Sequence, residues 1–280
     1  MTTASRLAVF AAAVAVLTGG AAAAGKTLQP DAPGGRATSE HGGTMDASML
    51  VRGLSVDQNG LRLVVDDPAF RRNQPQDLRF RILDDARGEP VRDFDLEHTK
   101  RMHLIVVRRD LTGFQHLHPR MQPDGTWTMP LRLTQAGSYR VFADFSHDDQ
   151  PTTLASDLRV DGSADLRALP VPETVAQSDR GDTVHLDATP TAGEEAELRF
   201  TVTRHGAPVE LQPYLGADGH LIALRDGDLA FLHVHPTAAD QPNEIHLETT
   251  FTTPGRYRLF LQFREAGRLH TAAFTLRVQP

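Results

Sequence analysis

Histidines recur at one fixed spacing in the two halves of this sequence. The first set is His103, His116 and His118, and the second set is His220, His233 and His235. Each set follows the pattern H-x12-H-x-H-P. Three neutral imidazoles on a rigid scaffold bind Zn²⁺ or Cu²⁺ and leave one position open for water or another ligand. The repeated spacing therefore predicts one copper or zinc ion in each half.

This spacing has a geometric meaning if the histidines lie on β-strands. Residues i and i+2 of a strand point to the same face, so each H-x-H pair places two imidazoles side by side. In the second set, Asp226–Gly227 is typical of a two-residue hairpin turn, which predicts that His220 lies opposite His233. The other residues of that face are apolar: Ile222, Leu224, Leu229 and Phe231. We therefore expect a histidine cluster at one end of an apolar face, and the first set follows by analogy.

Further donors accompany the first set. Met102 and Met121 carry thioether sulfur, which favours Cu(I), and both lie near the first set in the sequence. The alternative is that these methionines fill gaps in an apolar core, which is their more common role. Four other residues have no equivalent histidine in the opposite half and are fringe candidates: Asp144, His147, His246 and His270. Of these, only His147 is predicted as a possible metal ligand. No catalytic residue is predicted.

Short strands are the elements that must position these residues. Alternating segments rich in Val, Leu, Phe and Thr are separated by turn signals, and strong helical periodicity is absent. The halves repeat in order: MHLIVVRRDLTGFQHLHP (102–119) matches GHLIALRDGDLAFLHVHP (219–236), and AGSYRVFADF (136–145) matches PGRYRLFLQF (254–263). The segment G-x-Y-x-[VL]-F resembles the tyrosine-containing corner of immunoglobulin-like sandwiches. The predicted fold class is therefore all-β, with two tandem immunoglobulin-like β-sandwich domains produced by duplication.

The chain is predicted to divide into five segments. Residues 1–24 have the charged start, apolar run and small residues of a secretory signal peptide. Residues 25–47 are rich in Gly, Pro, Ser and Thr and indicate a flexible tether. Residues 48–161 and 183–280 are the two β-sandwich domains, joined by a linker at 162–182. The signal predicts export to the periplasm or the extracellular space, with an uncleaved anchor as the alternative.

Composition disfavours several classes of function. The formal net charge of −7 disfavours nucleic acid as a partner and predicts no electrostatic attraction to anionic membranes. The absence of cysteine excludes a disulfide framework and a lipid-attachment site on cysteine. No Ser-His-Asp order, phosphate loop or nucleotide fingerprint is visible. The expected partners are a metal ion and a metal transporter or another exported metal protein, with no membrane insertion after signal cleavage.

Taken together, the export signal, the sandwich-like strands, the HLHP and HVHP segments and the methionines near histidine resemble bacterial periplasmic metal-handling domains. The most similar kinds are the YtkA-like and CopC-like copper-associated domains. The sequence departs from CopC-like proteins because its expected mature N-terminus is Ala or Gly rather than a ligating His. The resemblance implies copper or zinc carriage, buffering or resistance.

Two other functions remain open. A secreted interaction or structural β-sandwich module could use the same histidines as packing residues at the corners where strands leave the sheet. A His₃ metalloenzyme is less favoured, because hydrolysis usually needs a carboxylate near the metal-bound water. Asp218 precedes His220 by two residues, but Arg101 stands at the matching position before His103. The sequence therefore favours a binding protein over an enzyme.

Overall fold

The computed structural model describes residues 51–237, 239 and 241–280. The predicted signal peptide (1–24) and tether (25–47) lie outside these residues. In the described part the regular elements are the strands β1 to β20, with no helix among them. It accordingly holds no helix of the length and apolarity that a membrane span requires. The predictions of an all-β fold and of two tandem β-sandwich domains are confirmed.

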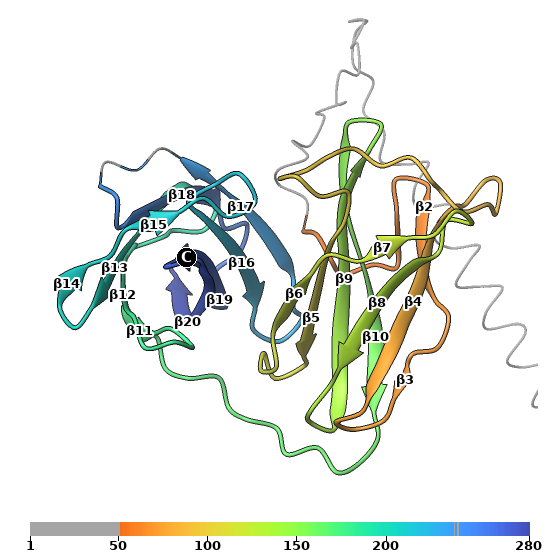
Figure 1. The fold of residues 1–280 in the computed structure, drawn as a ribbon, viewed down its shortest axis with the longest axis horizontal. Helices are drawn as coiled ribbons and strands as arrows, with labels where there is room; N and C mark the ends of the chain where they lie inside the picture. The colour runs from red at the N-terminus through yellow and green to blue at the C-terminus, as the bar shows by residue number, and fades with distance from the viewer. Residues whose placement is uncertain (1–50, 238, 240) are drawn as a thin grey trace, which may run out of the picture. The chain divides into compact units, whose positions relative to one another are not determined.

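The first domain is a sandwich of two five-stranded sheets (Figure 1). One sheet has the order β1 (Asp57–Gln58), β2 (Leu61–Val65), β4 (Pro75–Asp84), β8 (Trp127–Arg132) and β7 (Arg120–Met121). The other has the order β3 (Ala69–Phe70), β10 (Gln150–Val160), β9 (Gly137–His147), β5 (His103–Arg108) and β6 (Gln115–Leu117). Apolar side chains from both sheets fill the space between them and form one core. Burial of alternate residues in β2 and β4 explains the period-2 pattern of these segments.

The second domain forms one continuous path of strands around its own core (Figure 1). The path runs through β11 (Val175–Gln177), β12 (Thr183–Asp187), β13 (Glu195–Arg204), β18 (Glu244–Thr250), β17 (Phe231–Thr237), β16 (Gly219–Arg225), β19 (Gly255–Glu265) and β15 (Leu211–Gln212). β14 (Ala207–Pro208) pairs with β13, and β20 (Arg268–Val278) pairs with β19. β11 begins within the segment predicted as the linker, 162–182, whose residues 162–174 contain no strand.

A buried tyrosine marks the same corner in each domain. Tyr139 is buried, and its hydroxyl donates a hydrogen bond of 2.9 Å to the carbonyl oxygen of Gln135. Tyr257 is also buried, and its hydroxyl lies 3.0 Å from the carbonyl oxygen of Thr253. Both bonds reach back four residues, as the tyrosine corner of a β-sandwich does. The repeated G-x-Y segment therefore builds the same turn in both domains.

Strands β5 and β16 are buried on both faces, which is why their sequences are continuously apolar. In β5, Leu104 points into the core of the first domain, whereas Ile105 belongs to a separate apolar cluster. In β16, Leu221 and Ile222 divide in the same way. The separate cluster contains buried residues of both domains: Ile105, Val107, Leu111, Phe142, Ala155, Ile222, Leu224, Leu229, Phe231 and Phe260. We call it the interdomain cluster.

Aromatic contacts in this cluster are reciprocal. Phe114 of the first domain stacks on Phe260 of the second, with ring centroids 4.0 Å apart. Phe231 of the second domain contacts Phe142 of the first, with ring centroids 5.3 Å apart. In the repeat, Phe114 corresponds to Phe231 and Phe142 to Phe260. Each domain thus offers the same pair of residues to the other, as in an interface related by a two-fold axis.

The register of the second histidine hairpin differs from the predicted one by two residues. We expected a two-residue turn at Asp226–Gly227 with His220 opposite His233. Instead, Ile222 lies opposite His233. The first domain has the equivalent register, with Ile105 opposite His116. A shift of two residues keeps every side chain on its face of the sheet, so the expected shared face is unaffected.

Burial of one leucine accounts for this register. The loop spans residues 226–229 and is closed by backbone hydrogen bonds between residue 225 and residues 229 and 230. Leu229 adopts a left-handed φ of 63°, and its side chain is fully buried in the interdomain cluster. A two-residue turn would have placed Leu229 in the strand instead. Contact with the other domain, which the hairpin sequence does not contain, therefore favours the wider loop.

Candidate metal centre

The first histidine set converges on one face of the first domain. His103 begins β5, His116 lies in β6, and His118 follows β6 directly. One ring nitrogen from each of these three residues lies within 4.8 Å of the other two. The ring centroids are 5.2 Å apart for His103 and His116, 5.1 Å for His103 and His118, and 4.9 Å for His116 and His118. We call this group the histidine centre.

Carbonyl oxygens determine which nitrogens of two rings carry hydrogen. His103 Nε2 lies 3.1 Å from the carbonyl oxygen of Glu97, and His116 Nδ1 lies 2.8 Å from Oε1 of Gln262. Because these oxygens only accept, both nitrogens are donors, and a neutral imidazole has one N–H. The remaining nitrogens, His103 Nδ1 and His116 Nε2, lie 3.0 Å apart. In the neutral rings two lone pairs face each other there, an arrangement that a shared proton or metal ion stabilises.

His118 adds a third nitrogen to this group. Its Nε2 is buried and has no hydrogen-bond partner among the described residues. Burial, together with the neighbouring His103 and Lys100, lowers the pKa of His118 to about 4. Burial lowers the pKa of His116 to about 3, and the nearby His103 and His118 lower it further. Both rings are therefore neutral at pH 7, which is the protonation state that binds metal.

A tight turn holds the leading histidine in each domain. Residues 97–100 and residues 214–217 each form a turn closed by two backbone hydrogen bonds. The first carbonyl of each turn faces a histidine: Glu97 faces His103, and Tyr214 faces His220 at 3.0 Å from Nε2. Partners of this kind commonly fix the tautomer and orientation of metal-binding histidines. The duplication has therefore preserved the orienting contact as well as the histidine.

The turn in the first domain also presents His98. Both central residues have positive φ, 46° for His98 and 69° for Thr99, although such turns favour Asn-Gly. A β-branched residue in this conformation is strained. The ring centroid of His98 lies 5.1 Å from that of His220 and 6.3 Å from that of His103. The strained turn thus brings a fourth histidine of the first domain to the edge of the centre.

The second histidine set is only partly described. His220 lies on β16, and its ring centroid is 6.4 Å from those of both His103 and His116. The backbones of His233 and His235 lie on β17, where their partners are Ile222 and Glu248. The side chains of His233 and His235 lie outside the described part of the structure. His220 therefore lies close to the first set, and the separate ion expected in each domain stays a prediction.

The other predicted ligands lie beside or away from the histidine centre. Met102 is fully buried in the first domain's core, and Met121 is partly buried against it. Both line a pocket of about 480 Å³ that His118 also lines. His147 lies at the end of β9, and its Nδ1 contacts the carbonyl oxygen of Asp93 at 2.8 Å. The structure brings His147 into contact with Asp93 rather than with the three rings.

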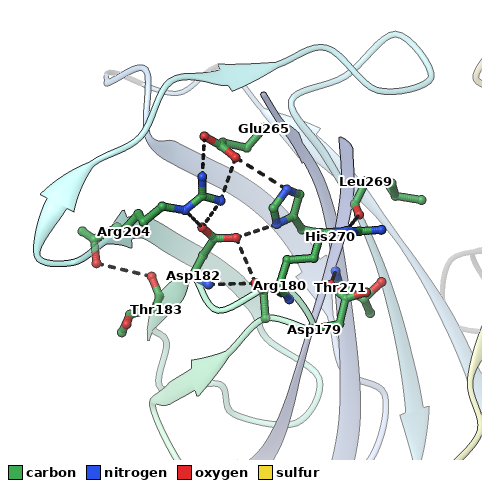
Figure 2. Close-up of polar contacts among 11 residues, drawn as sticks. Asp179, Arg180, Asp182, Thr183, Arg204, Glu265, Leu269, His270 and Thr271 are labelled. Atoms are coloured by element: carbon green, nitrogen blue, oxygen red, sulfur yellow. Dashed lines mark hydrogen bonds and ion pairs between the residues drawn. The ribbon is translucent and has the colours of Figure 1, made fainter. Parts of the chain in front are cut away.

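A second group of ionisable side chains lies in the second domain (Figure 2). We call Asp182, Arg204, Glu265 and His270 the ionic cluster. Arg204 Nη2 lies 2.6 Å from Asp182 Oδ1 and 2.8 Å from Glu265 Oε2. His270 Nδ1 lies 2.5 Å from Asp182 Oδ2, off the line of a hydrogen bond, and its Nε2 lies 3.6 Å from Glu265 Oε2. Asp182 and His270 are almost completely buried.

Charge balance distinguishes the ionic cluster from a cation site. Burial alone would raise the pKa of Asp182, but hydrogen bonds from Ser178 and Arg204 outweigh it and lower the pKa. The Arg204 guanidinium already occupies the space where a metal would meet both carboxylates. These residues therefore form an ion-pair network that supplies its own cation.

Two residues near the histidine centre, Gln262 and His98, were missed by the sequence analysis. Gln262 is a polar residue inside the buried strand β19 and is 5% exposed. A glutamine in the apolar run YRLFLQF was a signal that a hydrogen-bond partner lies opposite. Asp144, one of the fringe candidates of the sequence analysis, holds the equivalent position in β9, is the register partner of His103 and is also buried. His98 gave no such signal, because the residues of its turn are not typical turn residues.

Comparison with known proteins links the two domains to one family. A family model described as "Domain of unknown function (DUF8832)" matches residues 55–162 and again residues 176–280. The two matches correspond to the two sandwiches and to the internal repeat. No curated protein matches the chain.

Solved structures resemble the chain only distantly. Salmonella alpha-2-macroglobulin reacted with methylamine is 16% identical, with a TM-score of 0.29, over 84% of this chain and 16% of that chain. The Escherichia coli adhesin FdeC is 16% identical, with a TM-score of 0.27, over 81% of this chain and 66% of that one. Yersinia pseudotuberculosis InvD is 12% identical, with a TM-score of 0.28, over 80% and 58%. This chain thus spans a small part of the macroglobulin and less than two thirds of the adhesin.

Proposed function

We propose that this chain, which belongs to the DUF8832 family through both of its domains, binds a copper or zinc ion at the histidine centre. The observation that carries the proposal is the convergence of three ring nitrogens within 4.8 Å. Two of these nitrogens face each other at 3.0 Å, and their rings donate their other N–H groups to Glu97 and Gln262. A cation between the lone pairs removes their repulsion.

The spacing of the rings fits a first-row transition metal. Imidazoles bound to one tetrahedral Zn²⁺ at about 2.0–2.1 Å have ring centroids about 5 Å apart. The three separations here are 4.9, 5.1 and 5.2 Å. Neutral imidazole suits both zinc and copper, and the thioethers of Met102 and Met121 near His118 are compatible with Cu(I). Copper and zinc therefore remain the two ions to test.

Carriage or buffering of the ion is the role that this donor set supports. The expected export signal would place the protein where it meets periplasmic or extracellular metal, with a transporter or another exported metal protein as the acceptor. Hydrolytic catalysis is less favoured, because Arg101 occupies the position that Asp218 holds before His220. We therefore propose a metal-binding protein rather than a metalloenzyme.

A secreted interaction or structural module is the competing function. It is favoured by the hydrogen bonds that His103 and His116 make to Glu97 and Gln262, since buried histidines satisfied in this way also stabilise packing. In that case the histidine centre is a hydrogen-bonded polar group that stabilises packing at one end of the interdomain cluster. The two functions differ in whether the His118 nitrogen binds a metal ion.

Metal titration separates these two functions. Stripped protein is titrated with Zn²⁺ and with Cu²⁺ by calorimetry, and the double variant His116→Ala/His118→Ala is compared with His185→Ala, an exposed histidine on β12. We expect binding by the wild type and by His185→Ala and none by the double variant. Absence of binding by the folded wild type contradicts the proposal. If the double variant unfolds by circular dichroism, His118→Gln replaces it, because that ring donates no hydrogen bond to a described residue.

A further inference from the structure

His220 of the second domain lies within reach of the first domain's centre. Its ring centroid is 6.4 Å from those of His103 and His116, compared with about 5 Å for rings that share a tetrahedral zinc ion. An approach of roughly 1 Å would therefore bring this ring to a ligand distance. His220 is 3% exposed, and its ring centroid lies 5.1 Å from that of His98 in the first domain.

His220 has the same tautomer as His103. Its Nε2 lies 3.0 Å from the carbonyl oxygen of Tyr214, which only accepts, so in the neutral ring Nδ1 holds the lone pair. His103 is held in the same way by Glu97. The leading histidine of each repeat is therefore prepared to bind through the same nitrogen. The hydrogen bond from Nε2 to a turn carbonyl is present in both domains, as expected if both rings serve as metal ligands.

The second domain also orients a ligand of the first. Gln262 of β19 accepts the His116 Nδ1–H bond at 2.8 Å, and its amide nitrogen lies 3.4 Å from Thr271 Oγ1. A residue of the second domain therefore helps to direct His116 Nε2 at His103. Gln262 acts through His116 and is a positioning residue.

Apolar packing beside these residues fixes the two domains next to each other. The interdomain cluster includes fully buried residues from both domains, and its two aromatic contacts are reciprocal. Ile105 follows His103 by two residues and Ile222 follows His220 by two residues, so the histidines and the cluster lie on the same faces of their sheets. The polar end of this interface is the histidine centre.

From these contacts we propose one metal centre shared by both domains, in place of one ion in each. His103, His116 and His118 supply ligands from the first domain, His220 supplies a ligand from the second, and Gln262 orients His116. The inference rests on the proposed metal binding and adds that binding fastens the domains together. Metal loading then stabilises strands of the second domain that contribute no residue to the first histidine set.

Cobalt binding to the full chain tests the shared centre. Co²⁺ serves as a visible probe of ligand number, and its affinity is measured by competition with a chelator for wild type, His220→Ala and the control His185→Ala. We expect His220→Ala to weaken binding by about 10-fold or more and to change the cobalt absorption bands. Unchanged affinity and bands in His220→Ala overturn the shared centre. If His220→Ala fails to fold, His220→Gln, which retains a donor for the Tyr214 carbonyl, is measured instead under the same criteria.

Gln262 provides a matched pair of variants. Gln262→Leu removes the acceptor for His116 and is expected to weaken cobalt binding by about 10-fold, whereas Gln262→Glu retains an acceptor and restores it. Equal affinities for the two variants contradict a positioning role.

Hydrogen exchange distinguishes failure of the shared centre from failure of metal binding itself. With the metal bound, exchange of amides in β16 and β19 is expected to slow together with that in β5 and β6. Protection limited to residues 103–121 overturns the shared centre but leaves metal binding intact. If the folded wild type binds no Co²⁺, Zn²⁺ or Cu²⁺, the proposed function itself fails.

Discussion

The histidine centre and the ionic cluster are both buried groups of ionisable side chains, but they differ in charge balance. In the ionic cluster, Arg204 binds both carboxylates, and His270 lies beside them. In the histidine centre, the facing nitrogens of His103 and His116 lie 3.0 Å apart and both carry lone pairs when the rings are neutral. A cluster with its own cation stabilises the fold, whereas converging lone pairs provide a place for an external cation. Proximity of potential ligands is therefore insufficient to identify a metal site.

The largest expected difference between the two regions is in metal affinity. His103→Ala removes a ligand, so it should weaken Zn²⁺ binding by more than about 100-fold, beyond what changes in orienting partners usually cost. Asp182→Asn should leave the affinity unchanged, because Arg204 already pairs with both carboxylates of the ionic cluster. Competition with a chelator measures both variants. Weaker binding in Asp182→Asn together with unchanged binding in His103→Ala would show that the metal binds at the ionic cluster and not at the histidine centre.

Acid should destabilise the metal-free protein through the histidine centre. The pKa values of His116 and His118 fall to about 3 and about 4 because both rings are buried. In the unfolded chain each has its ordinary pKa of about 6.5, so that state binds protons first as the pH falls. The free energy of unfolding should therefore decrease from about pH 6.5 towards pH 4. Urea unfolding across this range should show a smaller slope in His116→Ala/His118→Ala, and an unchanged slope contradicts this assignment.

Loss of a carboxylate should mark the ionic cluster as structural. Asp182→Ala leaves a buried imidazole without its nearest partner and one side of Arg204 unpaired. We expect the free energy of unfolding to fall by about 2 kcal/mol, below the usual range for a broken buried pair because Arg204 is partly exposed. Urea denaturation compares this variant with Asp187→Ala, an exposed residue at the end of β12. Equal stability of the two variants would contradict a structural role.

The smallest expected effect concerns the buried carboxylate next to the centre. Asp144 is the register partner of His103, is 5% exposed and accepts a hydrogen bond of 2.6 Å from Thr153 Oγ1. Its negative charge on the same face should favour a bound cation, so Asp144→Asn should weaken Zn²⁺ binding by about 10-fold. Chelator competition measures this change. Tighter binding by the variant would show that the carboxylate does not support the cation.

Much of the scaffold could be predicted from the sequence, but the joining of the two repeats could not. Period-2 alternation and the repeated G-x-Y segment gave the sandwiches, and strand geometry gave the shared face of His116 and His118. The predicted register was wrong because Leu229 is buried against the other domain, a contact that the hairpin alone does not specify. Burial of β5 on both faces was not predicted from the sequence, although its residues are continuously apolar. Gln262 reaches the centre through that unpredicted packing, whereas His98 reaches it through a turn of unusual sequence in its own domain.

Metal stoichiometry tests the central claim most directly. Purified full-length protein is stripped with a chelator, reloaded with excess Zn²⁺ or Cu²⁺, desalted and analysed for metal and protein content. The shared histidine centre predicts one ion for each chain, lost in His116→Ala/His118→Ala and retained in Asp182→Asn. A folded wild type that retains no ion, or a folded double variant that retains as much as the wild type, contradicts the account.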